Sequence, residues 1–324
     1  MTDSLYRNVA LSHTAQLPVL GILTRFASNA PSVLEAVRQT YGAWNALTDG
    51  AGLVTPSSAR VRIIVHDSDE TFRDGPAVQY RLLDAERLLV MAPGTAGVAD
   101  TKRLDAVVYT TTRVVARSAE FADGLLEPLT LFLLGSQDRQ PLHAAAIVRR
   151  SVAIVLAGPG GSGKSTLTYA ARRAGYTVLA DEAVYVQLRP QLRIWGRRSR
   201  IHLPIGALEH FPELRGMQPT TLATGKTKVV VSPGEHRQYA EHVAVCLLKP
   251  GVGDQPTLER VPSDVVVAEL TGHLESGFDL YADTIRSRAA ALASGGGWRL
   301  TLGGSPLAAV PLLDGVVAEL EEGS

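Results

Sequence analysis

The residues that most directly indicate chemistry are the stretch GPGGSGKST at 158–166, which fills the pattern Gly-x-x-x-x-Gly-Lys-Ser. Glycines let a backbone turn its N–H groups inward around an anion, and a helix that starts here directs its positive end at the same anion. In such a loop Lys164 reaches the β- and γ-phosphates, and the Ser165 hydroxyl suits Mg²⁺. The stretch therefore predicts a site for ATP and Mg²⁺ made of Gly158, Pro159, Gly160, Gly161, Ser162, Gly163, Lys164, Ser165 and Thr166.

Two carboxylates, Asp181 and Glu182, end the strand-like segment VLADE that follows the loop. Strand ends in open α/β sheets face the ligand crevice. Beside a phosphate, one carboxylate can help to hold Mg²⁺ while the other accepts the proton of an attacking hydroxyl. Adjacent strand residues point to opposite faces, so both acids can act only if the strand breaks there. A solvated strand end is the alternative interpretation.

Other polar candidates flank the loop and the acids, and each has a structural alternative. His143 begins the strand before the loop strand, and a lone histidine is more often structural than catalytic. The basic candidates are Arg197, Arg198 and Arg200 in RIWGRRSRIHL and Lys226 and Lys228 in ATGKTKVVV. These cations could clamp a transferring phosphate or an acidic acceptor, or they could form solvated faces.

The segments around the loop must position these side chains. Residues 152–157 are almost all apolar, which predicts a strand buried on both faces. A helix over 165–174, ended by Gly175, and a strand over 176–182 complete a βαβ unit. Further strands are predicted at 183–188, 192–195, 227–231 and 242–248, and helices near 263–275, 281–293 and 312–322.

The N-terminal part has a different pattern. Residues 77–94 predict a hairpin that turns at 84–86, and the β-branched segment 103–116 predicts a strand or a strand pair. We expect residues 1–140 to form a smaller α+β subdomain, with recruitment of the acceptor as its role by elimination. Residues 141–324 are then the α/β nucleotide-binding domain.

Composition narrows the class of protein. Lys+Arg and Asp+Glu both number 32, so no net field draws the chain to nucleic acid or to an anionic membrane. The single cysteine, Cys246, excludes an internal disulfide, and its apolar neighbours predict a core position. No apolar run suits a membrane span and the first residues lack a secretory pattern, so we expect a cytoplasmic protein. The oligomeric state is left open, a homo-oligomer included.

Residues 141–190 resemble the nucleotide-binding core of the HPr kinase/phosphorylase family and of HPr-kinase-related proteins, some associated with ribosomally made, modified peptides. The resemblance lies in LHAAAIV and AIVLAGPGGSGKSTLTYAARRAGYTVLADEAV. It implies a P-loop kinase core related to phosphoenolpyruvate carboxykinase. It also implies that His143 lies near the γ-phosphate, that Asp181 helps to hold Mg²⁺ and that Glu182 takes the acceptor's proton.

The chain departs from the family pattern in three places. Glu182 stands where the family usually has aspartate, so its carboxylate lies one methylene further out. A further metal-site glutamate has no counterpart around RIWGRRSRIHLP, and the glycine-rich signature after that segment is missing. These departures argue against HPr as the acceptor and against a reverse phosphorylase activity.

The leading hypothesis is an ATP-dependent kinase that phosphorylates a serine or other hydroxyl of a peptide, a protein or a small molecule. Its catalytic groups are Glu182, Asp181, His143 and Arg200. The alternative is a nucleotide-gated binding protein with slow hydrolysis. A nucleic-acid-dependent ATPase is disfavoured by the zero net charge and by the lack of an aromatic-basic stripe.

Overall fold

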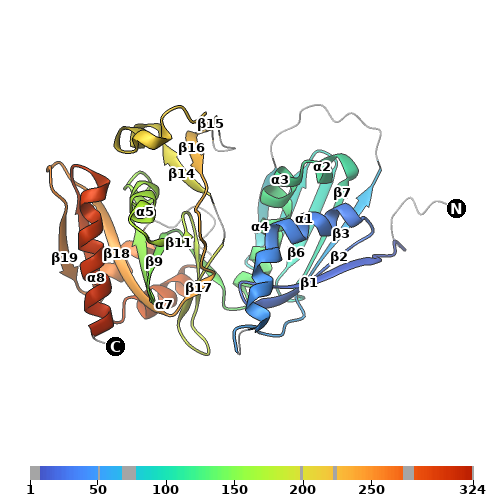
Figure 1. Cartoon of the computed structure of the whole chain (residues 1–324). Helices are drawn as coiled ribbons and strands as arrows, with labels where there is room; N and C mark the ends of the chain where they lie inside the picture. The colour runs from blue at the N-terminus through green and yellow to red at the C-terminus, as the bar shows by residue number, and fades with distance from the viewer. Residues whose placement is uncertain are drawn as a thin grey trace. The chain divides into compact units, whose positions relative to one another are not determined.

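The computed structural model describes residues 8–49, 52–67, 78–197, 200–221, 225–272 and 281–322. The chain is a mixed α/β protein that separates into two compact units, Met1–Gln137 and Asp138–Ser324 (Figure 1). Within the described residues no helix is both long and apolar enough to cross a bilayer.

The first unit is built on a seven-stranded sheet with the order β1-β2-β3-β7-β6-β5-β4. Its strands are β1 His13–Val19, β2 Ile22–Ser28, β3 Arg60–His66, β4 Gln79–Asp84, β5 Arg87–Ala92, β6 Thr95–Asp100 and β7 Asp105–Thr111. Its helices are α1 Pro31–Tyr41, η1 Gly42–Asp49, α2 Thr112–Ala116, α3 Ser118–Phe121, η2 Ala122–Leu126 and α4 Glu127–Gly135. α1 packs on β1 and β2, and α4 packs on β5, β6 and β7.

Two local features of this unit were not predicted from the sequence. β1 and β2 form a hairpin whose turn places Leu20 and Gly21 at positive φ, and leucine at such a position gives no turn signal. The predicted strand over 103–116 ends at Thr111, where the chain continues as α2. The Thr111 hydroxyl accepts a hydrogen bond from the Val114 N–H and so caps the new helix.

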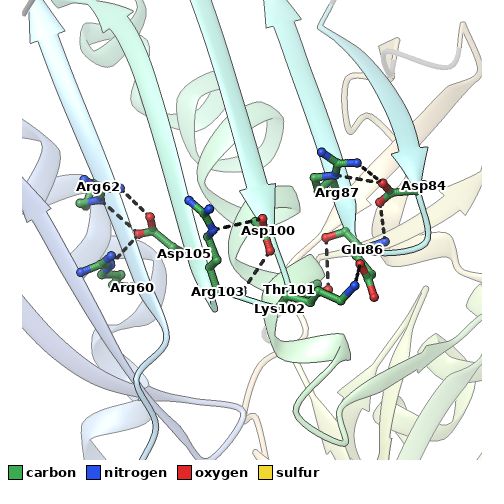
Figure 2. Close-up of polar contacts among 10 residues, drawn as sticks. All are labelled: Arg60, Arg62, Asp84, Glu86, Arg87, Asp100, Thr101, Lys102, Arg103 and Asp105. Atoms are coloured by element: carbon green, nitrogen blue, oxygen red, sulfur yellow. Dashed lines mark hydrogen bonds and ion pairs between the residues drawn. The ribbon is translucent and has the colours of Figure 1, made fainter.

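Ion pairs line one end of this sheet (Figure 2). Asp105, on β7, accepts from both Arg60 and Arg62 of the neighbouring strand β3, at 2.7 and 2.5 Å. Asp105 is 11% exposed, so this pairing is screened less than the open pairs of Arg87 and Lys102. The two arginines therefore support the parallel register of β3 and β7.

In the described residues of the second unit, three sheets are present. The largest has the order β11-β9-β10-β18-β20-β19, the second β17-β13-β12-β8 and the third β14-β16-β15. The strands are β8 Gln140–Leu142, β9 Ala145–Arg149, β10 Val152–Ala157, β11 Thr177–Ala180, β12 Val184–Gln187, β13 Arg193–Gly196, β14 Ile201–Pro204, β15 Thr220–Thr221, β16 Thr227–Val231, β17 Tyr239–Ala240, β18 His242–Pro250, β19 Thr257–Val261 and β20 Gly297–Leu302. The helices are α5 Lys164–Arg173, η3 Ile205–His210, η4 Pro212–Leu214, α6 Ser263–Gly272, α7 Ala282–Leu292, η6 Pro306–Ala309 and α8 Val310–Glu322.

The largest sheet is buried on both faces, as the apolar run 152–157 predicts. Ile154 and Leu156 of β10 pack in one core with α5, α8 and β14. Ala153 and Val155 face the opposite core, with β12, β13, α6 and α7. Cys246 of β18 lies fully buried, and burial raises the pKa of its thiol to about 12. A strand covered on both sides is a rigid support for the loop that follows it.

The unit β10–loop–α5–β11 carries the glycine-rich stretch, with one departure from a simple βαβ arrangement. β9 lies between β10 and β11 and is antiparallel to both. β10 and β11 thus run in the same direction, and β10 is also parallel to β18 on its other side. The C-terminal ends of β10 and β11 consequently lie at the same edge of the sheet, where the loop and the acids follow.

The small sheet β14-β16-β15 lies beside α5 (Figure 1). Ile201 and Leu203 of β14 are fully buried in the core shared with α5. On the other side of the main sheet, Gly196 at the end of β13 meets β11. A Cβ at Gly196 would collide with the carbonyl oxygen and the Cγ of Leu179. β11 is therefore held between α5 and β13 immediately before the two acids.

Gly196→Ala should destabilise the second unit, because the added methyl has no space beside the Leu179 backbone. We expect a loss of about 1–3 kcal/mol in the free energy of unfolding, measured by urea denaturation. Gly206→Ala is the matched control, because a Cβ there meets nothing within 4 Å. Equal stabilities of the two variants would contradict the packing of β13 on β11.

Candidate functional site

The loop after β10 has a conformation that requires glycine. Gly158, Gly161 and Gly163 have φ values of 151°, 82° and 98°. A Cβ at Gly158 would lie 2.8 Å from the Leu248 carbonyl oxygen, and one at Gly163 would lie 2.7 Å from a methyl of Leu302. The ends of β18 and β20 therefore close against the loop, and only glycine fits at these two contacts.

The loop leads directly into α5, whose N-cap is Gly163 in the left-handed conformation with no side-chain cap. The first N–H groups of α5 are thus left for another acceptor. Lys164, 8% exposed, donates from Nζ to the carbonyl oxygens of Gly158 at 2.7 Å and Pro159 at 3.1 Å. Burial lowers the pKa of its ammonium group. Within the described part of the chain, the buried Ser162 hydroxyl has no hydrogen-bond partner.

The two acids lie in a bend, because β11 ends at Ala180 rather than at the predicted residue 182. This break meets the condition under which adjacent carboxylates can serve one site. Asp181 is 1% exposed, whereas the Glu182 side chain is 46% exposed. The pair therefore combines one buried and one accessible carboxylate.

His202 of β14 contacts both acids. Its backbone N–H donates to Asp181 Oδ2 at 3.0 Å, and its Nδ1 lies 2.9 Å from Glu182 Oε1. A carboxylate accepts hydrogen bonds, so the Nδ1 atom carries the proton in this contact. One residue of β14 thus fixes the positions of two neighbouring carboxylates.

The two carboxylates differ in their ionisation. Burial raises the pKa of Asp181 to about 6, although the His202 N–H and the Ser165 side chain partly offset the shift by hydrogen bonding. The hydrogen bond from His202 lowers the pKa of Glu182, and the charges of Lys228 and His143 add to this effect. Glu182 is therefore ionised at neutral pH, while Asp181 titrates just below it.

The structure brings some of the predicted residues together. Ser165 and Asp181 are neighbours, and Lys228 on β16 lies close enough to affect the pKa values of both Lys164 and Glu182. His143 lies exposed in the bend between β8 and β9, within electrostatic reach of Glu182.

Among the described residues, no hydrogen bond or ion pair joins Arg200 or Lys226 to this cluster. Arg200 is exposed at the entrance to β14, and Lys226 is exposed before β16. Arg197 is half-buried after β13. Arg198 falls outside the described residues.

Sequence reasoning missed His202. It lies on β14, the third strand after Glu182, and the path of the chain through β12 and β13 brings it back to the acids. A weak signal existed in IHLP, because the apolar neighbours Ile201 and Leu203 must face the core and so turn His202 the other way.

The donors present fit a magnesium ion held mainly by a nucleotide. Among the described residues there is no cluster of three or more His, Cys, Asp or Glu side chains that could hold a metal. Mg²⁺ often needs only one or two protein ligands, since phosphates and water fill the other positions. Ser165 and Asp181 supply two oxygen donors next to the loop.

Comparison with known proteins shows no family for this chain. No protein-family model and no curated protein sequence matches the chain. Among solved structures, the chain is similar to the Hpr(Ser) kinase/phosphatase from Coxiella burnetii, with 12% identity over 56% of this chain and 99% of that one. The TM-score is 0.30, too low for the likeness to carry an argument about function.

Asp181→Asn should stabilise the nucleotide-free protein at pH 7.5. The folded state holds the Asp181 proton up to a pKa of about 6, whereas the unfolded chain releases it near pH 4. The folded state with Asp181 therefore loses stability as pH rises through this window. The asparagine variant has no carboxyl to ionise at this position and so does not lose that stability. We expect a gain of about 2–3 kcal/mol at pH 7.5 that disappears below pH 4, measured by urea denaturation without Mg²⁺.

The exposed Asp254 provides the matched control, and Asp254→Asn should leave the pH dependence of stability unchanged. A gain for Asp181→Asn that was equal at pH 4 and pH 7.5 would show that the carboxyl is not desolvated in the folded state.

Proposed function

We propose that this protein is an ATP-dependent kinase that transfers the γ-phosphoryl group to a hydroxyl of a peptide, a protein or a small molecule. The observation that carries the proposal is that three features meet at one edge of the sheet. They are a loop whose conformation requires glycine and which holds the buried Lys164, the buried Asp181 hydrogen-bonded to Ser165, and the accessible, ionised Glu182.

The loop would act as a P-loop. The Lys164 ammonium donates hydrogen bonds to two loop carbonyl oxygens. Phosphate oxygens could replace these carbonyls, because charged acceptors form stronger hydrogen bonds. The uncapped N–H groups at the start of α5 point their partial positive charge at the same place. The strand–loop–helix order and the sequence resemblance favour the P-loop kinase core of HPr-kinase-related proteins as the architecture of this unit.

Mg²⁺ would be held by Ser165 and Asp181 together with the nucleotide. When bound, it supplies positive charge to the phosphate oxygens during transfer. Asp181 must be ionised for this role, and the second positive charge beside it would stabilise the ionised form.

Glu182 would accept the proton of the acceptor hydroxyl. It is ionised at neutral pH and its side chain is nearly half exposed, so it combines the correct protonation state with access. A carboxylate suits this role, since protein kinases use an aspartate to accept the proton of the substrate hydroxyl. Lys164, Lys228 and His143 would stabilise negative charge on the moving group, and Arg200 is a further candidate from the mouth of β14.

The acceptor class follows from the base. A carboxylate positioned beside a phosphate site suits a neutral hydroxyl, whether of serine in a peptide or protein or of a small molecule. Since ATP is supplied in the cytoplasm, we place the activity there. The sequence resemblance includes kinases of modified-peptide biosynthesis, which makes a peptide serine the first acceptor to test.

Glu182→Gln should keep ATP binding and lose transfer. The amide retains the size of the side chain but cannot take a proton, so we expect the rate of transfer to fall by about 10²–10⁴-fold. The Kd for ATP, measured by isothermal titration calorimetry, should stay within about threefold, since the contacts to the loop remain. Glu209→Gln, on the exposed part of η3, is the control. A Glu182→Gln protein that transfers phosphate at the original rate would contradict the assignment of the base.

The fate of the γ-phosphate separates the kinase from a nucleotide-gated binding protein. The full chain is incubated with γ-labelled ATP, Mg²⁺ and a soluble cell extract. A kinase should move label onto an acceptor, and Lys164→Met should abolish the transfer because the phosphates lose their cation. Label found only in free phosphate would support slow hydrolysis by a binding protein instead.

A further inference from the structure

We propose that His202 is a positioning residue of this site, which holds one oxygen of Glu182 so that the other oxygen meets the acceptor hydroxyl. The inference rests on the proposed function and adds to it a residue that neither the loop motif nor the sequence resemblance includes.

The first support is the contact itself. Nδ1 of His202 lies 2.9 Å from Glu182 Oε1, a normal distance for a charge-assisted hydrogen bond. Among the described residues no hydrogen bond engages Glu182 Oε2. The imidazole is the more covered partner, with 19% of its side chain exposed against 46% for Glu182. The histidine is therefore the more shielded member of the pair, and the carboxylate is the group that an acceptor can reach.

The second support is the rigidity of the element that carries the histidine. Ile201 and Leu203 on either side are fully buried, and β14 is paired with β16. The His202 N–H is also bonded to Asp181 Oδ2. Any shift of β14 would therefore move its contacts with both acids together, so the residue sets the spacing between the buried and the accessible carboxylate.

The third support comes from the identity of the base. Glutamate has one more rotatable bond than aspartate, so an unheld Glu182 would spread over more rotamers. A donor fixed on a strand removes this freedom before the acceptor arrives. Preorganisation of this kind contributes to the rate without touching the substrate.

The proton balance keeps the imidazole outside the transfer. The acceptor O–H bond breaks and its proton goes to Glu182 Oε2, while the acceptor oxygen forms its bond to the γ-phosphorus. The bond from that phosphorus to the β–γ bridging oxygen breaks, and its electron pair leaves with ADP. His202 keeps its Nδ1 proton throughout and faces a carboxyl group that has become neutral.

The first test compares two substitutions at position 202 in the labelled-ATP assay with soluble cell extract. His202→Ala removes the donor, and we expect transfer at saturating ATP to fall about 10–100-fold, with KM for ATP unchanged. His202→Asn places an amide N–H near the position of Nδ1, so we expect activity within about fivefold of the original. His210→Ala, at an exposed histidine of η3, should have no effect.

The second test reads the contact without any acceptor. Nitrogen NMR of the full-length protein labelled at histidine should show the Nδ1–H tautomer for His202 at a pH where the ring is neutral. Glu182→Ala should shift this ring toward the Nε2–H tautomer, while His210 keeps its signal.

The two tests distinguish the inference from the function on which it rests. An unchanged His202 tautomer in Glu182→Ala would overturn the positioning role. A His202→Asn variant as inactive as His202→Ala would also overturn it, because the imidazole ring itself would then take part in the proton transfer. Absence of label transfer by the original protein would reject the kinase instead, and the tautomer would still decide whether His202 holds Glu182.

Discussion

The arrangement of the site depends on one constraint, namely that two neighbouring carboxylates must face one place although adjacent residues of a strand face opposite ways. The chain meets it by ending β11 at Ala180 and placing Asp181 and Glu182 in a bend. His202 then holds both acids, one through its backbone and one through its ring. Burial raises the pKa of Asp181, whereas the hydrogen bond from His202 lowers the pKa of Glu182, so the two neighbouring carboxyls differ in acidity.

The rest of the second unit supports this bend and the loop beside it. β10 is covered on both faces, and β18 and β20 close against Gly158 and Gly163. β13 packs on β11 through Gly196, and α5 contacts β11 as well. The buried charges of Lys164 and Asp181 oppose folding when no ligand is present. The extensive apolar packing of the two cores around them offsets that effect.

The sequence was sufficient where local chemistry determines structure. The apolar run of β10, the glycines of the loop and the start of α5 could each be located from residue types alone. The sequence was insufficient where pairing over long distances decides. The insertion of β9 between β10 and β11 and the return of His202 to the acids depend on sheet topology. The β1–β2 hairpin escaped notice because Leu20 occupies a turn position that usually signals itself by glycine or asparagine.

The most direct measurement is a crystal structure of the full chain with Mg²⁺ and a non-hydrolysable ATP analogue. The account predicts that the Lys164 ammonium leaves the carbonyls of Gly158 and Pro159 for the terminal phosphates, with Ser165 and Asp181 at the metal and Glu182 facing the γ-phosphorus. A loop without nucleotide, or a bound analogue with both carboxylates turned away from that phosphorus, would contradict it.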